Sequence, residues 1–265
     1  MNRLARVMEA VRIRCDREHL PFVAASAPCA PTSVPSLVMV VRTLTLQLEQ
    51  PASVVAGLAV HLDPHEAAAA AARTSDAARR RYSVAHGSVR EILGDVIGVD
   101  PATIRFDRRC RHCGDTDHGK PAVTDMPGLS FSVAHSGSMA VVAISARATV
   151  GVDVEIVRRR ASLDRLAARV LAPAELAGWQ ALPDVDRLVG LLRAWTAKEA
   201  YLKAIGLGLA GGVRTAPTDP PGWSVKELDV GPAAIATLAV AGDVDVEPVP
   251  APWAPEGGVT LALER

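Results

Sequence analysis

Two carboxylates stand two residues apart in a segment of alternating character, residues 151–157. Side chains two apart on a β-strand share a face, so Asp153 and Glu155 would project together with Cα atoms roughly 6.5–7 Å apart. Carboxylates this close repel one another unless a proton or a cation lies between them. Oxygen ligands of this kind select Mg²⁺ or Ca²⁺ over softer metals. The alternative is an ordinary antiparallel strand with one polar face, and the strand pattern alone favours that alternative.

A third acid, Glu199, lies within an apolar stripe on a predicted helix. The stripe recurs at helical spacing and consists of Leu188, Leu192, Trp195 and Leu202. A carboxylate without a partner is costly on such a face, so we expect Glu199 to share a cation with Asp153 and Glu155. Lys203, one turn further on, adds a positive charge at the same place. The alternative is an exposed Glu–Lys pair that contributes little. We expect the neighbouring Lys198 to extend its stem outward to solvent.

Other side chains suit the binding of a phosphate. His135 and Ser136 are predicted to lie in a turn between two strands, where both can hydrogen-bond a phosphate oxygen. Lys120 precedes Pro121, whose ring fixes the backbone beside the cation. A loop histidine without a role is an equal alternative for His135. The basic run at residues 79–81 lies on a predicted helix and is typical of a solvated face.

The composition indicates a globular protein and excludes some classes of partner. The chain has 265 residues, enough for one large domain or two small ones. Lys and Arg together number 29, as do Asp and Glu, so no bulk positive charge predicts binding to nucleic acid. No segment approaches the ~18 or more uninterrupted apolar residues of a membrane span. We therefore expect neither nucleic-acid nor membrane partners.

The four cysteines are too few for a disulfide scaffold and indicate a reducing, cytoplasmic compartment. Cys110 and Cys113 form a Cys-x-x-Cys pair, with His112 and His118 nearby. A structural zinc site needs four well-placed ligands, and His112 would have an awkward reach. A pair of small thiols, either buried or redox-sensitive, is therefore favoured over zinc.

Residues 1–50 are predicted to be a flexible N-terminal extension, because their central part is rich in Pro, Ala and Ser. Two halves follow, 51–150 and 151–265, with a similar layout of strand, helices and strands. Strands are expected at 54–62, 104–107, 129–133, 139–145 and 151–157, and in the segment after Trp223. Helices are expected at 64–73, 76–93, 163–170, 173–179 and 185–205. Asp63 is a predicted N-cap, and Gly94 and Gly206 are predicted helix ends.

Two motifs closely resemble the paired signature of the 4′-phosphopantetheinyl transferases. One is Gly-Val-Asp-Val-Glu at 151–155, and the other is Trp-Thr-Ala-Lys-Glu-Ala-Tyr-Leu-Lys-Ala-Ile-Gly at 195–206. Gly-Lys-Pro at 119–121 and Phe-Ser-Val-Ala-His-Ser at 131–136 are similar to motifs of the large, monomeric, surfactin-synthetase-type subgroup. The likeness runs from about residue 54 to 212, and more loosely to the C-terminus, and leaves residues 1–50 outside it.

The resemblance implies an α/β (α+β) fold of two similar subdomains related by a pseudo-twofold axis, with coenzyme A between them. It implies Mg²⁺-dependent transfer of the 4′-phosphopantetheine arm of coenzyme A to a serine of an acyl or peptidyl carrier protein. Adenosine 3′,5′-bisphosphate is the second product. The resemblance further implies that the protein is a monomer, because one chain supplies both halves.

Site residues are carried over by motif. The resemblance implies that the metal ligands are Asp153, Glu155 and Glu199. It implies that the catalytic residues are Glu199 (as the base for the serine proton), Lys203 and His135. The implied contacts of the coenzyme are Arg81, Lys120, Pro121, His135, Ser136, Asp153 and Lys203.

The chain departs from the family's pattern at three places. Ala134 stands where the family has a serine, and Ser132 stands where it has an asparagine. Basic residues that some members place on the first helix are replaced by Glu66 and a run of alanines. The contact with the 3′-phosphate therefore falls to a substitute, for which the candidates are Arg73, Arg81 and Arg108.

Two other functions stay open at this point. One is an Mg²⁺-dependent nucleotide phosphohydrolase, and the other is a non-catalytic homologue that binds coenzyme A or a carrier protein. Carrier proteins are acidic around the acceptor serine, so Arg158, Arg159 and Arg160, with Arg165 nearby, are expected to steer the carrier. A solvated charge run is an equal alternative for these arginines.

Overall fold

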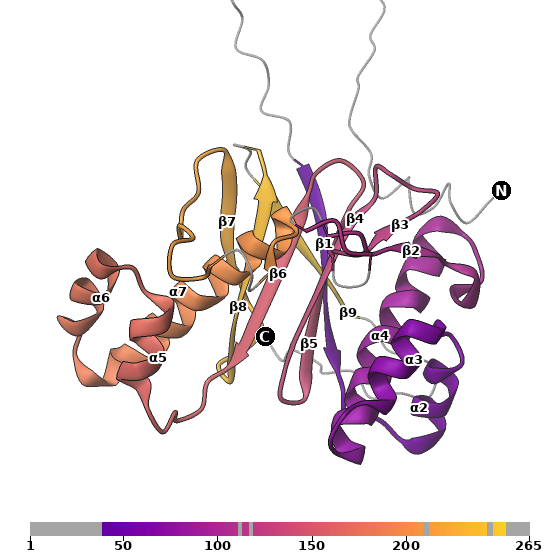
Figure 1. Cartoon of the computed structure of the whole chain (residues 1–265), viewed down its shortest axis with the longest axis horizontal. Coiled ribbons are helices and arrows are strands. Elements are labelled where there is room, and N and C mark those ends of the chain that lie inside the picture. Colours follow the sequence, from indigo (N-terminus) through magenta and orange to yellow (C-terminus); the bar gives the residue numbers. More distant parts are fainter. Residues whose placement is uncertain (1–38, 111–112, 117–118, 209–211, 243–245, 253–265) are drawn as a thin grey trace, which may run out of the picture.

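The chain folds as a mixed α/β protein in which two sheets are flanked by helices on either side (Figure 1). The computed structural model describes residues 39–110, 113–116, 119–208, 212–242 and 246–252. The expected α/β class is thus confirmed. Within these ranges, no helix is both long enough and apolar enough to cross a membrane.

The larger sheet has the strand order β4 (Ser130–Ser136), β5 (Met139–Ser145), β1 (Met39–Gln47) and β9 (Val246–Pro252). Strand β1 runs antiparallel to β5 and parallel to β9. The prediction that residues 1–50 form a flexible extension is therefore wrong for Met39–Gln47, because this segment is an interior strand with a partner on each side. Strand β9, from the predicted second half, pairs with β1 in the larger sheet. The predicted boundary at residue 150 therefore does not assign each sheet to one half.

Helices α2 (Ala52–Ala59), α3 (Pro64–Ala71) and α4 (Asp76–Ile97) lie together on one flank (Figure 1). The prediction of a strand at 54–62 is wrong, because the apolar residues Val54 and Leu58, one turn apart, bury one helical face. The predicted cap of α3 is confirmed, since the Asp63 side chain accepts a hydrogen bond from the Glu66 N–H at 2.9 Å. Helix α4 continues past Gly94 and ends instead at Gly98, which has a φ of 76°.

The smaller sheet has the order β6 (Val150–Ile156), β8 (Ala234–Ala241) and β7 (Trp223–Leu228). Helices α5 (Leu163–Val170), α6 (Pro173–Gln180) and α7 (Asp184–Ile205) accompany it, close to the predicted ranges. Gly206 ends α7 as predicted, with a φ of 77°. A short helical turn, η1 (Pro101–Thr103), and a small ladder of β2 (Phe106–Asp107) and β3 (Ala122–Val123) complete the described elements.

Strand β6 lies beside β4, and serine hydroxyls join the two strands. Backbone N–H groups of Val150, Val152 and Ile156 donate to the hydroxyls of Ser130, Ser132 and Ser136, respectively, at 3.1–3.2 Å. The other edge of β6 pairs with β8. The two sheets meet along this seam and share an apolar core that includes Val141, Val152, Val154 and Leu238. The seam therefore fixes the acidic strand relative to β4, which carries His135.

Candidate active site

Gly151 allows α7 to lie directly against β6. A Cβ atom at Gly151 would collide with the carbonyl oxygen of Ala200 and the amide nitrogen of Ala204. Only a residue without a side chain permits this approach, and small residues on α7 complete it. Figure 1 shows the helix and the strand side by side. Their contact brings the acidic strand next to Glu199 and Lys203.

Asp153 and Glu199 are buried acids, 7% and 5% exposed. The Oδ2 atom of Asp153 and the Oε1 atom of Glu199 are buried without a hydrogen-bond partner in the described part of the chain. Burial raises the pKa of Asp153 from 3.8 to about 6, and repulsion from Glu199 and Glu155 contributes to the increase. Burial also raises the pKa of Glu199, and the charge of Glu155 adds to it. Buried carboxylate oxygens without partners suit a hard cation.

Lys203 is the positive charge beside these acids. Its Nζ donates to Oδ1 of Asp153 at 2.6 Å, and its side chain is 30% exposed. The charge of Lys203 lowers the pKa of both Asp153 and Glu199, although burial outweighs this effect at each. The structure therefore brings together Asp153, Glu199 and Lys203, as the sequence predicted.

Glu155 lies at the exposed end of the acidic face and has partners of its own. Its Oε2 accepts from Nη2 of Arg160 at 2.7 Å and from the hydroxyl of Ser136 at 3.1 Å. Within the described ranges, no group of three or more His, Cys, Asp or Glu side chains is arranged to hold a metal ion. The donor set of Asp153 and Glu199 fits a cation, and Glu155 as the third ligand stays a prediction. The Ser136 hydroxyl hydrogen is used by Glu155, so a phosphate contact through it also stays a prediction.

Several basic groups face the site from separate elements. His135 lies near the end of β4, where the strand extends one residue beyond it, so the expected turn begins only at Gly137. Partial desolvation lowers the pKa of His135, and the neighbouring His86, Lys203 and Arg73 lower it further. These four groups come from β4, α4, α7 and the segment after α3. The three other groups all act on His135, so the four together form a basic region suited to a polyanion.

His86 was missed by sequence reasoning. Its ring stacks on Tyr82 with centroids 4.0 Å apart, and the guanidinium of Arg73 lies 4.5 Å from the centroid of the Tyr82 ring. Tyr82 and His86 are one turn apart on α4, so their spacing was visible in the sequence. The sequence pattern did not reveal that α4 folds near β4, which carries His135.

Lys120 binds across the seam between the two sheets. Its Nζ donates to the carbonyl of Val150 at 2.6 Å, to the carbonyl of Ala204 at 3.1 Å and to the hydroxyl of Ser130 at 3.3 Å. The ammonium thus lies at the C-terminal end of α7, where a cation is favoured. Contact of Lys120 and Pro121 with a coenzyme stays a prediction, and a phosphate would have to displace one of these acceptors.

Arg73, Arg81 and Arg108, the candidate substitutes for the missing basic residues of the first helix, differ in their partners. Arg81 pairs with Glu49 at the surface, where their side chains are 39% and 54% exposed. Arg108 donates to Asp63 at 2.8 Å. Arg73 stacks on Tyr82 and acts on His135, as described above. Of the three candidates, Arg73 is therefore the one whose charge acts on His135.

Glu66 has a structural role in this chain. It is 4% exposed, and its Oε2 accepts from Nε of the fully buried Arg90 at 2.5 Å. Arg90 also donates to Asp63 at 2.7 Å and to the carbonyl of Ile104 at 3.0 Å. The acid that replaces a basic residue of the family pattern thus neutralises an arginine in the core.

Lys198 does not reach solvent, so this prediction is wrong. Its side chain is fully buried, and its Nζ donates to Oε2 of Glu175 at 2.5 Å and to the carbonyl of Val170 at 3.2 Å. The helices α5 and α6 cover this side of α7, which the helical pattern alone did not reveal. The pair fixes the turn of α7 that also carries Glu199.

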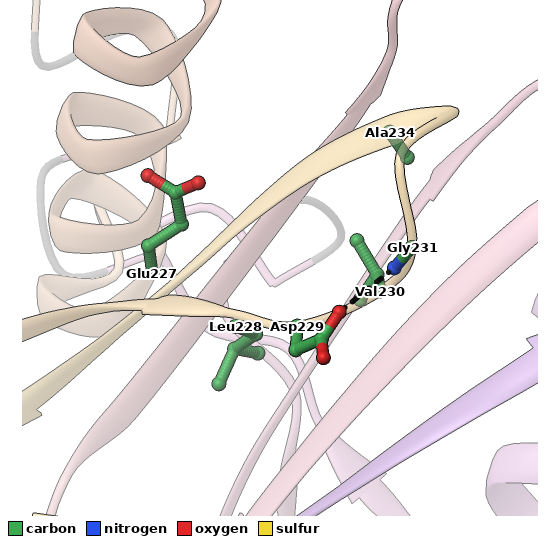
Figure 2. A pocket seen from close by; sticks show the side chains of 6 residues that line it. All are labelled: Glu227, Leu228, Asp229, Val230, Gly231 and Ala234. Atoms are coloured by element: carbon green, nitrogen blue, oxygen red, sulfur yellow. Dashed lines mark hydrogen bonds between the residues drawn. The ribbon is translucent and has the colours of Figure 1, made fainter. Parts of the chain in front are cut away.

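A hollow of about 360 Å³ lies at the β7–β8 turn. Its lining residues are Glu227, Leu228, Asp229, Val230, Gly231 and Ala234 (Figure 2). Figure 2 shows Asp229 accepting a hydrogen bond from the N–H of Gly231, at 3.1 Å. None of the predicted site residues lines this hollow.

The predicted zinc alternative involves residues that are only partly described. Cys110 is buried and Cys113 is exposed, which does not suit a pair of thiols buried together. His112 and His118 lie outside the described residues.

The sequence was compared with known proteins. The model of the 4′-phosphopantetheinyl transferase superfamily matches residues 149–248, which include β6 and α7. The 4′-phosphopantetheinyl transferase HetI of Nostoc sp. (strain PCC 7120 / SAG 25.82 / UTEX 2576) is 35% identical over 210 residues, 74% of this chain and 86% of HetI. The 4′-phosphopantetheinyl transferase Sfp of Bacillus subtilis (strain 168) is 26% identical over 133 residues, 49% of this chain and 58% of Sfp. Together with the paired motifs of β6 and α7, the match to HetI shows that the chain belongs to the 4′-phosphopantetheinyl transferase superfamily.

Proposed function

We propose that this enzyme transfers the 4′-phosphopantetheine arm of coenzyme A to the acceptor serine of an acyl or peptidyl carrier protein in an Mg²⁺-dependent reaction. The serine oxygen forms a bond to the β-phosphorus of coenzyme A, and the bond from that phosphorus to the bridging oxygen breaks. The serine proton passes to the enzyme, and adenosine 3′,5′-bisphosphate leaves. Names of the relatives support the transfer of phosphopantetheine, while the metal and the second product are part of the proposal.

One observation carries this proposal. Two buried acids from different elements, Asp153 and Glu199, each have a carboxylate oxygen without a partner in the described chain, and Lys203 donates a hydrogen bond to the other oxygen of Asp153. Such oxygens favour a hard divalent cation. The cation would supply charge neutralisation on the pyrophosphate of coenzyme A. Asp153 and Glu199 would hold it, with Glu155 as the third ligand.

Glu199 is the proposed base. In the metal-free chain burial raises the pKa of Glu199, and its position on α7 beside Lys203 places its carboxylate at the proposed reacting centre. Its position on α7 is fixed by the adjacent buried pair of Lys198 and Glu175. Glu199 takes the serine proton either directly or through a water molecule.

The basic region binds the phosphates of coenzyme A in this proposal. Lys203 and His135 hold the pyrophosphate, where Lys203 also stabilises negative charge on the leaving group. Arg73 replaces the missing basic helix residues as the contact of the 3′-phosphate, with His86 beside it. Desolvation and the neighbouring positive charges lower the pKa of His135, which favours the neutral imidazole as a hydrogen-bond donor to the phosphate.

The carrier protein approaches over the loop that follows β6. Arg158 and Arg159 are exposed in this loop, and both fit the proposal of a docking surface for an acidic partner. Arg160 is instead paired with Glu155, so it belongs to the site rather than to the free surface. The acids and the basic region come from one chain, which supports a monomer as the active form.

One assay separates this function from its rivals. The full chain is incubated with coenzyme A, Mg²⁺ and an unmodified carrier protein, and the intact mass of the carrier is measured. Gain of one phosphopantetheine on the acceptor serine is the expected result. Release of nucleotide without a carrier would instead support a phosphohydrolase, and binding without any product would support a non-catalytic homologue.

A further inference from the structure

Of the three acids Asp153, Glu155 and Glu199, Glu155 is the one that pairs with an arginine in the described part of the chain. Nη2 of Arg160 lies 2.7 Å from Oε2 of Glu155, and both side chains are 19% exposed. The Ser136 hydroxyl donates to the same oxygen at 3.1 Å. Partial burial strengthens this charge-assisted contact relative to a surface pair.

Arg160 is also distinct from the two arginines before it. Arg158 and Arg159 are exposed, whereas Nε of Arg160 is buried and has no hydrogen-bond partner among the described residues. A buried donor without an acceptor costs free energy, so other contacts of the guanidinium must offset this cost. Among the described residues Arg160 forms an ion pair with Glu155, so this acid accounts for its position.

The three acids therefore differ in how their charge is compensated. Asp153 has Lys203, Glu155 has Arg160, and Glu199 faces the same region with an oxygen that has no partner. No trio of acids in the described residues has metal-site geometry, although Glu155 lies close enough to raise the pKa of Asp153 and Glu199.

We propose that Arg160 is a positioning residue that competes with the divalent cation for the carboxylate of Glu155. While Arg160 is bound, Glu155 is held toward the loop after β6. When Glu155 turns to join Asp153 and Glu199, the guanidinium must leave Oε2, because two cations at one oxygen repel one another. Residues 157–160 form no helix or strand, so Arg160 can move without disrupting an element. The proposal rests on the metal site of the proposed function.

The test measures metal binding rather than activity. Isothermal titration calorimetry with Mg²⁺, and electron paramagnetic resonance with Mn²⁺, are applied to the metal-free full chain without coenzyme A. Arg160→Ala and Arg160→Gln should each bind the cation roughly three- to tenfold more tightly than the wild type. Two substitutions are used in case one of them prevents folding, and circular dichroism checks that each variant is folded.

A matched control separates competition from a general field effect. Arg159→Ala removes the same charge from the adjacent exposed position and should leave the metal affinity within about twofold of the wild type. In a Glu155→Gln background, Arg160→Ala should likewise have little effect, because the carboxylate for which the two cations compete is gone. Equal tightening in both backgrounds, or by Arg159→Ala, would overturn the proposal.

Other outcomes distinguish this inference from the proposed function. Binding by the wild type with no tightening in the Arg160 variants overturns the role of Arg160 and leaves the transfer reaction standing. Absence of cation binding in every variant overturns both the role of Arg160 and the metal site. Phosphopantetheine transfer is measured separately by the mass of the carrier protein.

Discussion

Lys203 donates from Nζ to Oδ1 of Asp153 at 2.6 Å across 50 residues of sequence. The contact joins α7 to β6 and places a cation on one oxygen of Asp153, while the other oxygen is buried without a partner in the described chain. One oxygen of Asp153 is therefore paired with a positive charge, and the other is available for a further ligand. This asymmetry suits the proposed roles of Asp153 as a metal ligand and Lys203 as a phosphate contact.

The proposed base and the innermost metal ligand should both be essential. Glu199→Gln and Asp153→Ala are expected to lower the rate of phosphopantetheine transfer by about 10²-fold or more, since each removes a charged oxygen from the reacting centre. The rate is measured from the mass of the carrier protein over time. Circular dichroism should remain that of the wild type. Normal turnover in either variant would remove the mechanism.

The glycine under α7 should tolerate no side chain. Gly151→Ala places a methyl group against the backbone of Ala200 and Ala204, so α7 must shift away from β6. We expect a loss of at least about 1–3 kcal/mol in the free energy of unfolding, measured by urea denaturation, together with loss of transfer. Gly178→Ala is the control, because a Cβ atom there meets nothing within 4 Å. If both variants behaved alike, close packing at Gly151 would not be the cause.

Breaking the ion pair between the buried Lys198 on α7 and Glu175 on α6 should be more costly than removing both charges. Glu175→Gln leaves the Lys198 ammonium buried without its counter-charge and should lower the free energy of unfolding by about 3 kcal/mol. The double variant Glu175→Gln with Lys198→Met removes the stranded charge and should recover part of this loss. Urea denaturation of the two variants and the wild type gives the comparison. A double variant less stable than Glu175→Gln would contradict the argument.

Ionisation of Asp153 should destabilise the metal-free protein. Its folded pKa of about 6 exceeds the ordinary value of 3.8, so the native state binds more protons than the unfolded state between these values. Stability is therefore lost as the pH rises from about 4 to about 6, by on the order of 2–3 kcal/mol. Asp153→Asn, measured in chelator, should become more stable than the wild type over this range and keep that advantage at pH 7.

The exposed Asp219→Asn is the control for this measurement, and it should track the wild type at every pH. Added Mg²⁺ should stabilise the wild type at pH 7 and have much less effect on Asp153→Asn. A constant difference between wild type and Asp153→Asn across the pH range would exclude Asp153 as the titrating group.

The loop after β6 should steer the carrier protein. Charge reversal at the exposed pair, Arg158→Glu with Arg159→Glu, is expected to raise the apparent KM for an acidic carrier and to weaken its dependence on salt. The KM for coenzyme A should not change, because these arginines lie outside the coenzyme site. An unchanged KM for the carrier would favour the alternative of a solvated charge run.

Local patterns in the sequence determined much of the fold and the chemical type of the site. Alternation predicted that Asp153 and Glu155 share one face of a strand, and helical spacing predicted that Glu199 is buried beside Lys203. The cap at Asp63 and the helix end at Gly206 were predicted for the same reason, since each depends on residues within one turn. These features follow from contacts between near neighbours.

Contacts between residues distant in sequence decided the features that the local patterns did not predict. Residues 52–59 form a helix and not a strand because Val54 and Leu58 find an apolar partner in α4. Lys198 is buried because Glu175, on another helix, compensates its charge. The acidic face of β6 is covered because Gly151 admits α7, and Glu155 is paired because the loop after β6 brings Arg160 to it. Each of these outcomes depends on a partner distant in sequence or on the path of a loop, which periodicity does not encode.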